Sequence, residues 1–105
     1  MTLDDCVQAL GLRNIDFIKL DVSGNEPSVL KGAQNMLARM RPVVISQFAP
    51  YLHGEAFAPM IALLRELDYR AETKLDKRPV DLTPESVAAE CERGRGVDLI
   101  LRPVT

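Results

Sequence analysis

The stretch "IDFIKLDVSGNEPSVLKGA", residues 15–33, decides the fold class of this 105-residue chain. It begins as a nearly continuous apolar run, breaks at Gly24 and continues with the apolar spacing of a helix. Such a run predicts a strand that helices cover on both faces. Two charged residues, Lys19 and Asp21, nevertheless lie near its end. Because burying an unpaired charge is costly, these side chains are expected either to pair or to meet a ligand.

The segments that follow predict a strand–helix–strand unit. Pro27 suits the first turn of a helix, and the stripe Val29, Leu30, Ala33, Leu37 and Met40 continues that helix until Pro42 disfavours helical geometry in the residue before it. The apolar run "VVISQF", residues 43–48, then predicts a second strand. Two strands joined by a helix of this length are expected to be parallel, with a right-handed crossover.

The remaining segments extend this pattern to both ends of the chain. Thr2 and Asp5 have capping-box spacing, which predicts a short helix that Gly11 ends. Later segments predict a helix from Pro59, a strand in "YRAETKL", a helix opened by Thr83 and a closing strand in "VDLILRP". The predicted fold class is therefore α/β, with about four mostly parallel strands and flanking helices in one domain over residues 1–105.

Composition and charge exclude several classes of function. The chain is 47% apolar and 27% charged, which is typical of a globular protein. A net charge of −2 argues against binding nucleic acid or an anionic membrane. Cys6 and Cys91 lack CxxC spacing, which favours reduced thiols over a disulfide or metal site. Without an apolar run of membrane-spanning length, the chain is expected to be soluble and cytoplasmic.

A polar site is predicted where the first two strands end. In open α/β sheets, ligands bind outside the carboxyl ends of the strands. The residues that can reach this edge are Lys19 and Asp21 of the first strand, Asn25 and Glu26 after it, Gln47 of the second strand and His53 of the next loop. Asp21, Asn25, Glu26, Gln47 and His53 could converge above an apolar sheet, with Lys19 one pleat deeper along its strand.

The same residues allow a structural interpretation. Lys19 and Asp21 could form a structural pair, Asn25 or Glu26 could cap a helix, and His53 could be a solvated loop residue. Other chemistry has less support from the sequence. The glycines in "GRGVDL" precede a strand, whereas a phosphate-binding loop follows one, and the carboxylates are too scattered to predict a metal site.

Five segments together resemble the second half of FkbM-type methyltransferases, which are S-adenosylmethionine-dependent enzymes with a Rossmann-like, seven-stranded fold. These segments are "TLDD", "IDFIKLDVSGNEPSVLKGA", "RPVVISQF", "LLRELDY" and "LILRP", and they follow the same order. The resemblance implies a partial Rossmann-like sheet containing strands four to seven. It further implies that the chain is the C-terminal half of a methyltransferase domain, with O-methyl transfer to a small-molecule acceptor as the activity.

The resemblance also implies roles for particular residues. The family's Lys-x-Asp motif falls on Lys19 and Asp21, its glycine on Gly24 and its next acidic residue on Glu26. The expected catalytic pair is Asp21 and Lys19. Asp21 is expected to orient the acceptor or the cofactor, while Lys19 sets the local field around it. The expected substrate-binding residues are Asn25, Glu26, Gln47 and His53.

Two departures and one absence separate the chain from the family pattern. Ser23 and Gln47 stand where the family usually has acidic residues. The family's glycine-rich cofactor loop follows its first strand, and no such loop follows a predicted strand here. S-adenosylmethionine is thus the expected cofactor of the complete enzyme, with little binding to this chain alone. The alternative is a non-catalytic remnant that serves as a binding or assembly module, with homo-oligomers forming through the exposed sheet edge.

Overall fold

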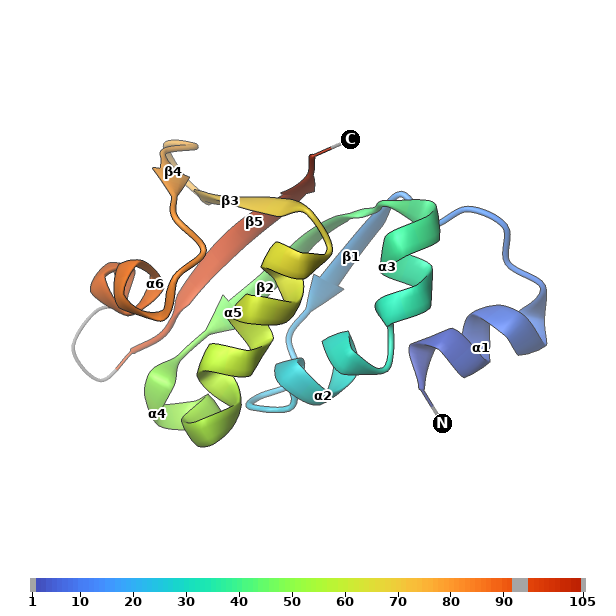
Figure 1. Cartoon of the computed structure of the whole chain (residues 1–105), viewed down its shortest axis with the longest axis horizontal. Coiled ribbons are helices and arrows are strands. Elements are labelled where there is room, and N and C mark those ends of the chain that lie inside the picture. Colours follow the sequence, from blue (N-terminus) through green and yellow to red (C-terminus); the bar gives the residue numbers. More distant parts are fainter. Residues whose placement is uncertain (1, 92–94, 105) are drawn as a thin grey trace.

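Two parallel strands, β1 (Phe17–Leu20) and β2 (Val43–Phe48), form one side of a five-stranded sheet in the computed structural model, which describes residues 2–91 and 95–104 (Figure 1). The order of the sheet is β1-β2-β5-β3-β4. The other strands are β3 (Tyr69–Thr73), β4 (Pro79–Val80) and β5 (Val97–Pro103). The predicted parallel pair is confirmed, and within the described residues β1 is an edge strand.

The expectation of about four mostly parallel strands is wrong, because three of the four strand pairings are antiparallel. β5 lies between β2 and β3 and runs antiparallel to both, so β2 and β3 share one direction. The connection before β5 includes α6 (Pro84–Glu90) and returns the chain to the end of the sheet where β2 and β3 finish, because β4 and β5 are both antiparallel to β3 and so run in the same direction. β5 therefore starts beside the carboxyl end of β2, where Val97 pairs with Phe48, and runs the opposite way.

The helix predicted after β1 is divided in two, which corrects the expectation of one continuous helix. α2 (Glu26–Lys31) and α3 (Gln34–Met40) are separated at Gly32. A Cβ atom at Gly32 would lie 2.9 Å from the Cβ of Thr2, so the chain at this break packs directly against the start of α1 (Leu3–Leu10). The break thus depends on a contact with the first residues of the chain.

Asp4 of α1 caps the second of these helices. Its carboxylate accepts hydrogen bonds from the backbone N–H groups of Asn35 (3.1 Å) and Met36 (2.9 Å). α3 has no side-chain cap at its own N-cap residue, so a residue about 30 positions earlier supplies the acceptor.

Local capping signals are confirmed at two other helices. The capping box of Thr2 and Asp5 is present at α1, and Gly11 ends that helix in the left-handed conformation at φ 65°. Thr83 accepts from the N–H of Ser86 at the start of α6. The 49–58 segment, expected to be a loop, instead holds α4 (Pro50–His53) and the 3₁₀ turn η1 (Gly54–Ala56) before α5 (Phe57–Glu66).

Helices α2, α3 and α5 lie on the same side of the sheet (Figure 1). The side chains of β2 accordingly alternate between buried residues (Val44, Ser46 and Phe48) and half-buried ones. On the opposite face Phe17 is 54% exposed and Lys19 is exposed. The expectation that helices cover both faces of the first strand is therefore wrong for the part of the chain that the structure describes.

Two further observations concern features predicted from composition. Cys6 and Cys91 are both free thiols and half-buried. Within residues 2–91 and 95–104, every helix is too short or too polar to cross a bilayer.

Candidate functional site

A tight turn follows β1 and places Asp21 at the edge of the sheet. Ser23 (φ 48°) and Gly24 (φ 100°) both adopt left-handed backbone conformations, which a glycine accommodates without strain. The carboxylate of Glu26 folds back and accepts from the N–H groups of Val22 (3.1 Å) and Gly24 (2.9 Å). Glu26 is fully buried, so its side chain closes the turn from inside the protein.

His53 of α4 reaches the same carboxylate. Its Nε2 atom lies 2.9 Å from Oε1 of Glu26, and its Nδ1 atom lies 3.2 Å from the backbone nitrogen of Ala49. A backbone N–H can only donate, so Nδ1 must accept and carries no proton. Nε2 therefore carries the proton and donates a hydrogen bond to Glu26, which makes His53 a neutral imidazole in this arrangement.

The Glu26 carboxyl is held in its ionised form. Burial by itself raises the pKa of a carboxyl, because it penalises the charged form. The hydrogen bonds from His53 and from the backbone N–H groups of Val22, Gly24 and Glu26 outweigh that penalty and lower the pKa of Glu26 below its ordinary value of 4.5. The pair is therefore a buried carboxylate and a neutral imidazole, not two opposite charges.

The two predicted catalytic residues lie on the solvent side of this turn. Lys19 and Asp21 are both exposed. Among the described residues, no ion pair joins either of them to a partner, so the structural pair that the sequence allowed is not formed. Asn25 is also exposed and makes no side-chain cap on α2. These three side chains are available to a ligand.

Gln47 lies on the same open face as Lys19. The parallel register pairs Lys19 with Ile45, and Gln47 follows two residues further along β2. Its side-chain amide borders Gly96, where a Cβ atom would lie 3.1 Å from Nε2. Gln47 is half-buried near the end of β2, and its amide lies on the side of β2 that faces β5.

The structure divides the six predicted residues into two groups. Glu26 and His53 contact each other with side chains that are 0% exposed, whereas Lys19, Asp21 and Asn25 are exposed and Gln47 is half-buried. Direct substrate binding by Glu26 and His53 stays a prediction, and it requires both side chains to leave their pairing first. The sequence predicted both residues at this end of the sheet, but it gave no sign of their direct contact, because they are 27 positions apart and no periodic pattern links them.

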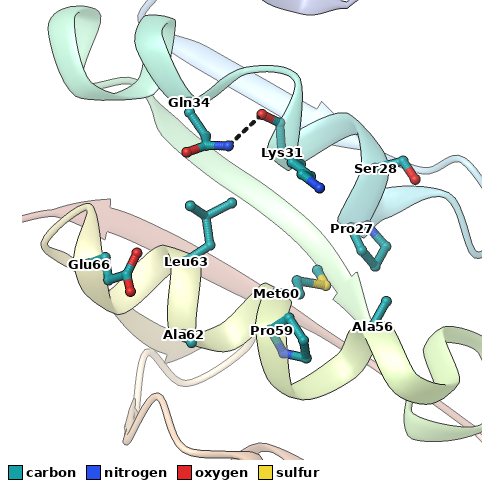
Figure 2. Close-up of a pocket in the computed structure, with 10 residues that line it drawn as sticks. All are labelled: Pro27, Ser28, Lys31, Gln34, Ala56, Pro59, Met60, Ala62, Leu63 and Glu66. Carbon is teal, nitrogen blue, oxygen red and sulfur yellow. Dashed lines mark hydrogen bonds between the residues drawn. The ribbon is translucent and has the colours of Figure 1, made fainter.

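A hollow lies away from the strand ends, between α5 and the α2–α3 segment (Figure 2). It encloses about 560 Å³ and is lined mainly by apolar side chains, among them Pro27, Met60 and Leu63. Lys31 and Glu66 lie on its opposite sides (Figure 2). None of the predicted site residues lines it, and it contains no set of groups that would perform chemistry.

Within the described residues, no group of three or more His, Cys, Asp or Glu side chains could hold a metal ion. The chemistry available at the strand edge is instead hydrogen bonding, from the carboxylate of Asp21, the ammonium of Lys19 and the amides of Asn25 and Gln47.

The fold and this edge define an α/β protein with a polar site at the carboxyl ends of two parallel strands. The model of the methyltransferase FkbM domain matches residues 1–71 of the 105. The chain therefore belongs to the FkbM methyltransferase family. The match ends within β3, so the closing strand, whose sequence also resembles the family, lies beyond it. No curated protein and no solved structure matches the chain.

Membership of a methyltransferase family suggests S-adenosylmethionine as the cofactor, but the turns after β1 and β2 do not form a cradle for it. The N–H groups of Val22 and Gly24 in the turn after β1 donate to Glu26 rather than outward. The turn after β2 leads directly into α4 and has no glycine-rich sequence. Neither of these two turns therefore offers the backbone approach that a cofactor loop needs.

Proposed function

We propose that this chain forms the C-terminal half of an S-adenosylmethionine-dependent methyltransferase domain that transfers a methyl group to a hydroxyl of a small molecule. The observation that carries the proposal is the position of β1. It is an edge strand among the described residues, so one of its sides is unpaired. The exposed polar residues Lys19 and Asp21 lie at its carboxyl end. In a doubly wound sheet, the strand that carries the glycine-rich loop belongs at this side.

The open face of the sheet supports the same proposal. Phe17, Val43 and Ile45 follow one another across β1 and β2 on the face opposite the helices, where Phe17 is exposed and Val43 and Ile45 are half-buried. A sheet with parallel strands normally has helices on both faces. A segment that supplies the first strand and its helix would pair with β1 and cover this apolar strip.

Within that site, the exposed residues at the strand edge act on the acceptor. The carboxylate of Asp21 accepts a hydrogen bond from the acceptor hydroxyl and orients its oxygen, while Lys19 supplies a positive field one pleat below. Asn25 and Gln47 hold other polar groups of the acceptor. Positioning of this kind is the main contribution that a protein makes to an in-line displacement.

The proposal is tested by supplying the cofactor loop. The chain would be fused to an upstream segment of another FkbM family member that carries a strand and its glycine-rich loop. We expect calorimetric titration to show saturable S-adenosylmethionine binding to the fusion and none to the chain alone. A fusion whose glycines in the loop are replaced by alanine is the matched control. Saturable binding to the chain alone would contradict the proposal, because another segment would then form the cradle.

A second candidate function is a non-catalytic binding or assembly module. Ser23 and Gln47 favour it, since both replace acidic residues at the edge of the sheet. Fewer carboxylates at the site weaken both acid–base chemistry and recognition of a hydroxyl. A well-folded fusion that does not bind the cofactor would favour this alternative over the methyltransferase.

A further inference from the structure

A buried chain of hydrogen bonds connects the ends of β1 and β2. It runs from the N–H groups of Val22 and Gly24 to the carboxylate of Glu26, then to Nε2 of His53, and from Nδ1 of His53 to the N–H of Ala49. We call these five residues the buried relay. Val22 and Gly24 follow β1, whereas Ala49 follows β2, so the relay spans the two walls of the candidate site.

The centre of the relay is buried. Glu26 and Ala49 are fully buried, and His53 is 6% exposed. Oε1 of Glu26 accepts from both Gly24 and His53, while Oε2 accepts from Val22. Because Glu26, His53 and Ala49 are buried, losing one of these three leaves a buried polar atom without a partner.

The ends of the relay adjoin the site residues in sequence. Asp21 immediately precedes Val22, and Gln47 lies two residues before Ala49. We propose that the buried relay is a positioning device that fixes Asp21 relative to Gln47, so that Glu26 and His53 act through the two turns and do not touch the acceptor. The importance of the relay for methyl transfer rests on the proposed function, whereas its effect on the two turns does not.

Two substitutions of His53 separate the two halves of the relay. His53→Gln keeps an amide donor where Nε2 lies but loses the acceptor for the N–H of Ala49. His53→Asn keeps an acceptor where Nδ1 lies but cannot reach Glu26. Glu26→Gln has nearly the same shape as glutamate, yet it must turn its NH₂ group toward a donor and so leaves at least one donor without a partner.

Hydrogen exchange of single backbone amides in the 105-residue chain, followed by NMR, tests the proposal. In Glu26→Gln we expect exchange at Val22 or Gly24 to be about tenfold or more faster, with shifted signals of Asp21, while β2 and β5 amides such as Ile45 and Leu99 speed up by a clearly smaller factor that reflects the global loss of stability. In His53→Gln the backbone amide of Ala49 should exchange faster by a similar factor, and the signals of Gln47 should shift. In His53→Asn the amide of Ala49 should keep its protection against exchange.

Glu72→Gln is the matched control, because it also turns a carboxylate into an amide in the same sheet, at the Glu72–Arg102 ion pair. It should leave the exchange of Val22, Gly24 and Ala49 unchanged. Should Glu26→Gln leave Val22 and Gly24 unchanged, or speed exchange equally throughout the sheet, the positioning role is overturned.

The unmodified chain provides a test that needs no variant to fold. The ¹⁵N spectrum of His53 at neutral pH should show a protonated Nε2 and an unprotonated Nδ1. A doubly protonated ring, or a proton on Nδ1, would overturn the relay. None of these measurements requires the cofactor, so the relay and the methyltransferase proposal can fail independently.

Discussion

Asp21 is exposed at the carboxyl end of β1 and has no ion-pair partner among the described residues. We expect Asp21→Asn in the fusion with a cofactor loop to lower the rate of methyl transfer at least tenfold with no comparable loss of stability, because the change removes a charge that faces the acceptor. Steady-state kinetics and thermal unfolding of the same samples check this. Asp16→Asn, an exposed carboxylate just before β1, should change neither quantity. Parallel losses of activity and melting temperature in Asp21→Asn would show a structural role.

Glu26 should make the stability of the chain depend on pH. Its pKa is lowered in the folded protein, despite burial, by the hydrogen bonds of His53 and the backbone. Its stabilisation is therefore fully present above the ordinary pKa of 4.5 and is lost as the pH falls through the lower, folded value.

We expect Glu26→Gln to melt at a lower temperature than the unmodified chain at pH 7 and the difference to shrink below about pH 4.5. Melting curves of both proteins between pH 7 and pH 3 measure it. A difference that is constant over this range would show that the charge of Glu26 does not contribute to stability.

At the scale of elements, the junction of α1 and α3 depends on one carboxylate. Asp4 accepts two backbone hydrogen bonds from the first turn of α3, which otherwise has no side-chain cap. We expect Asp4→Ala to lower the free energy of unfolding by about 1 kcal/mol, within the range of measured helix caps. Urea denaturation checks the value. Asp5→Ala, which removes only the hydrogen bond to the exposed N–H of Thr2, should cost less. An equal cost would mean that Asp4 is not a specific cap.

The whole molecule has an unpaired edge and an open sheet face. Within the described residues, β1 pairs only with β2, contains no proline and carries the 54% exposed Phe17. Exposed edges of this kind promote strand pairing between chains. We expect the purified chain to form dimers or larger species, and Phe17→Lys to shift them toward the monomer.

Light scattering coupled to gel filtration measures this equilibrium. Leu75→Lys is the matched control, because Leu75 is 96% exposed and lies outside the strands of the sheet. A sharp monomer peak with cooperative thermal unfolding of the unmodified chain would contradict the prediction and favour a self-sufficient module.

Local sequence determined the features whose hydrogen bonds close within a few residues. The capping box of Thr2 and Asp5, the left-handed Gly11 and the Thr83 cap were all predictable, since each partner lies three or four positions away at most. The parallel β1–β2 pair followed from the length of its connection. The position of Asp21 and Gln47 at the carboxyl ends of their strands followed in turn, because neighbouring parallel strands finish at the same end of a sheet.

Only the tertiary structure decided features that join distant residues. The break at Gly32 depends on contacts of Thr2 and Asp4, and the antiparallel insertion of β5 depends on where the preceding connection leaves the chain. The pairing of Glu26 with His53 likewise brings together residues 27 positions apart. The physical reason is common to all three. A buried polar group or an unpaired strand bonds to the partner that packing brings close to it, and the periodicity of the local sequence does not identify that partner.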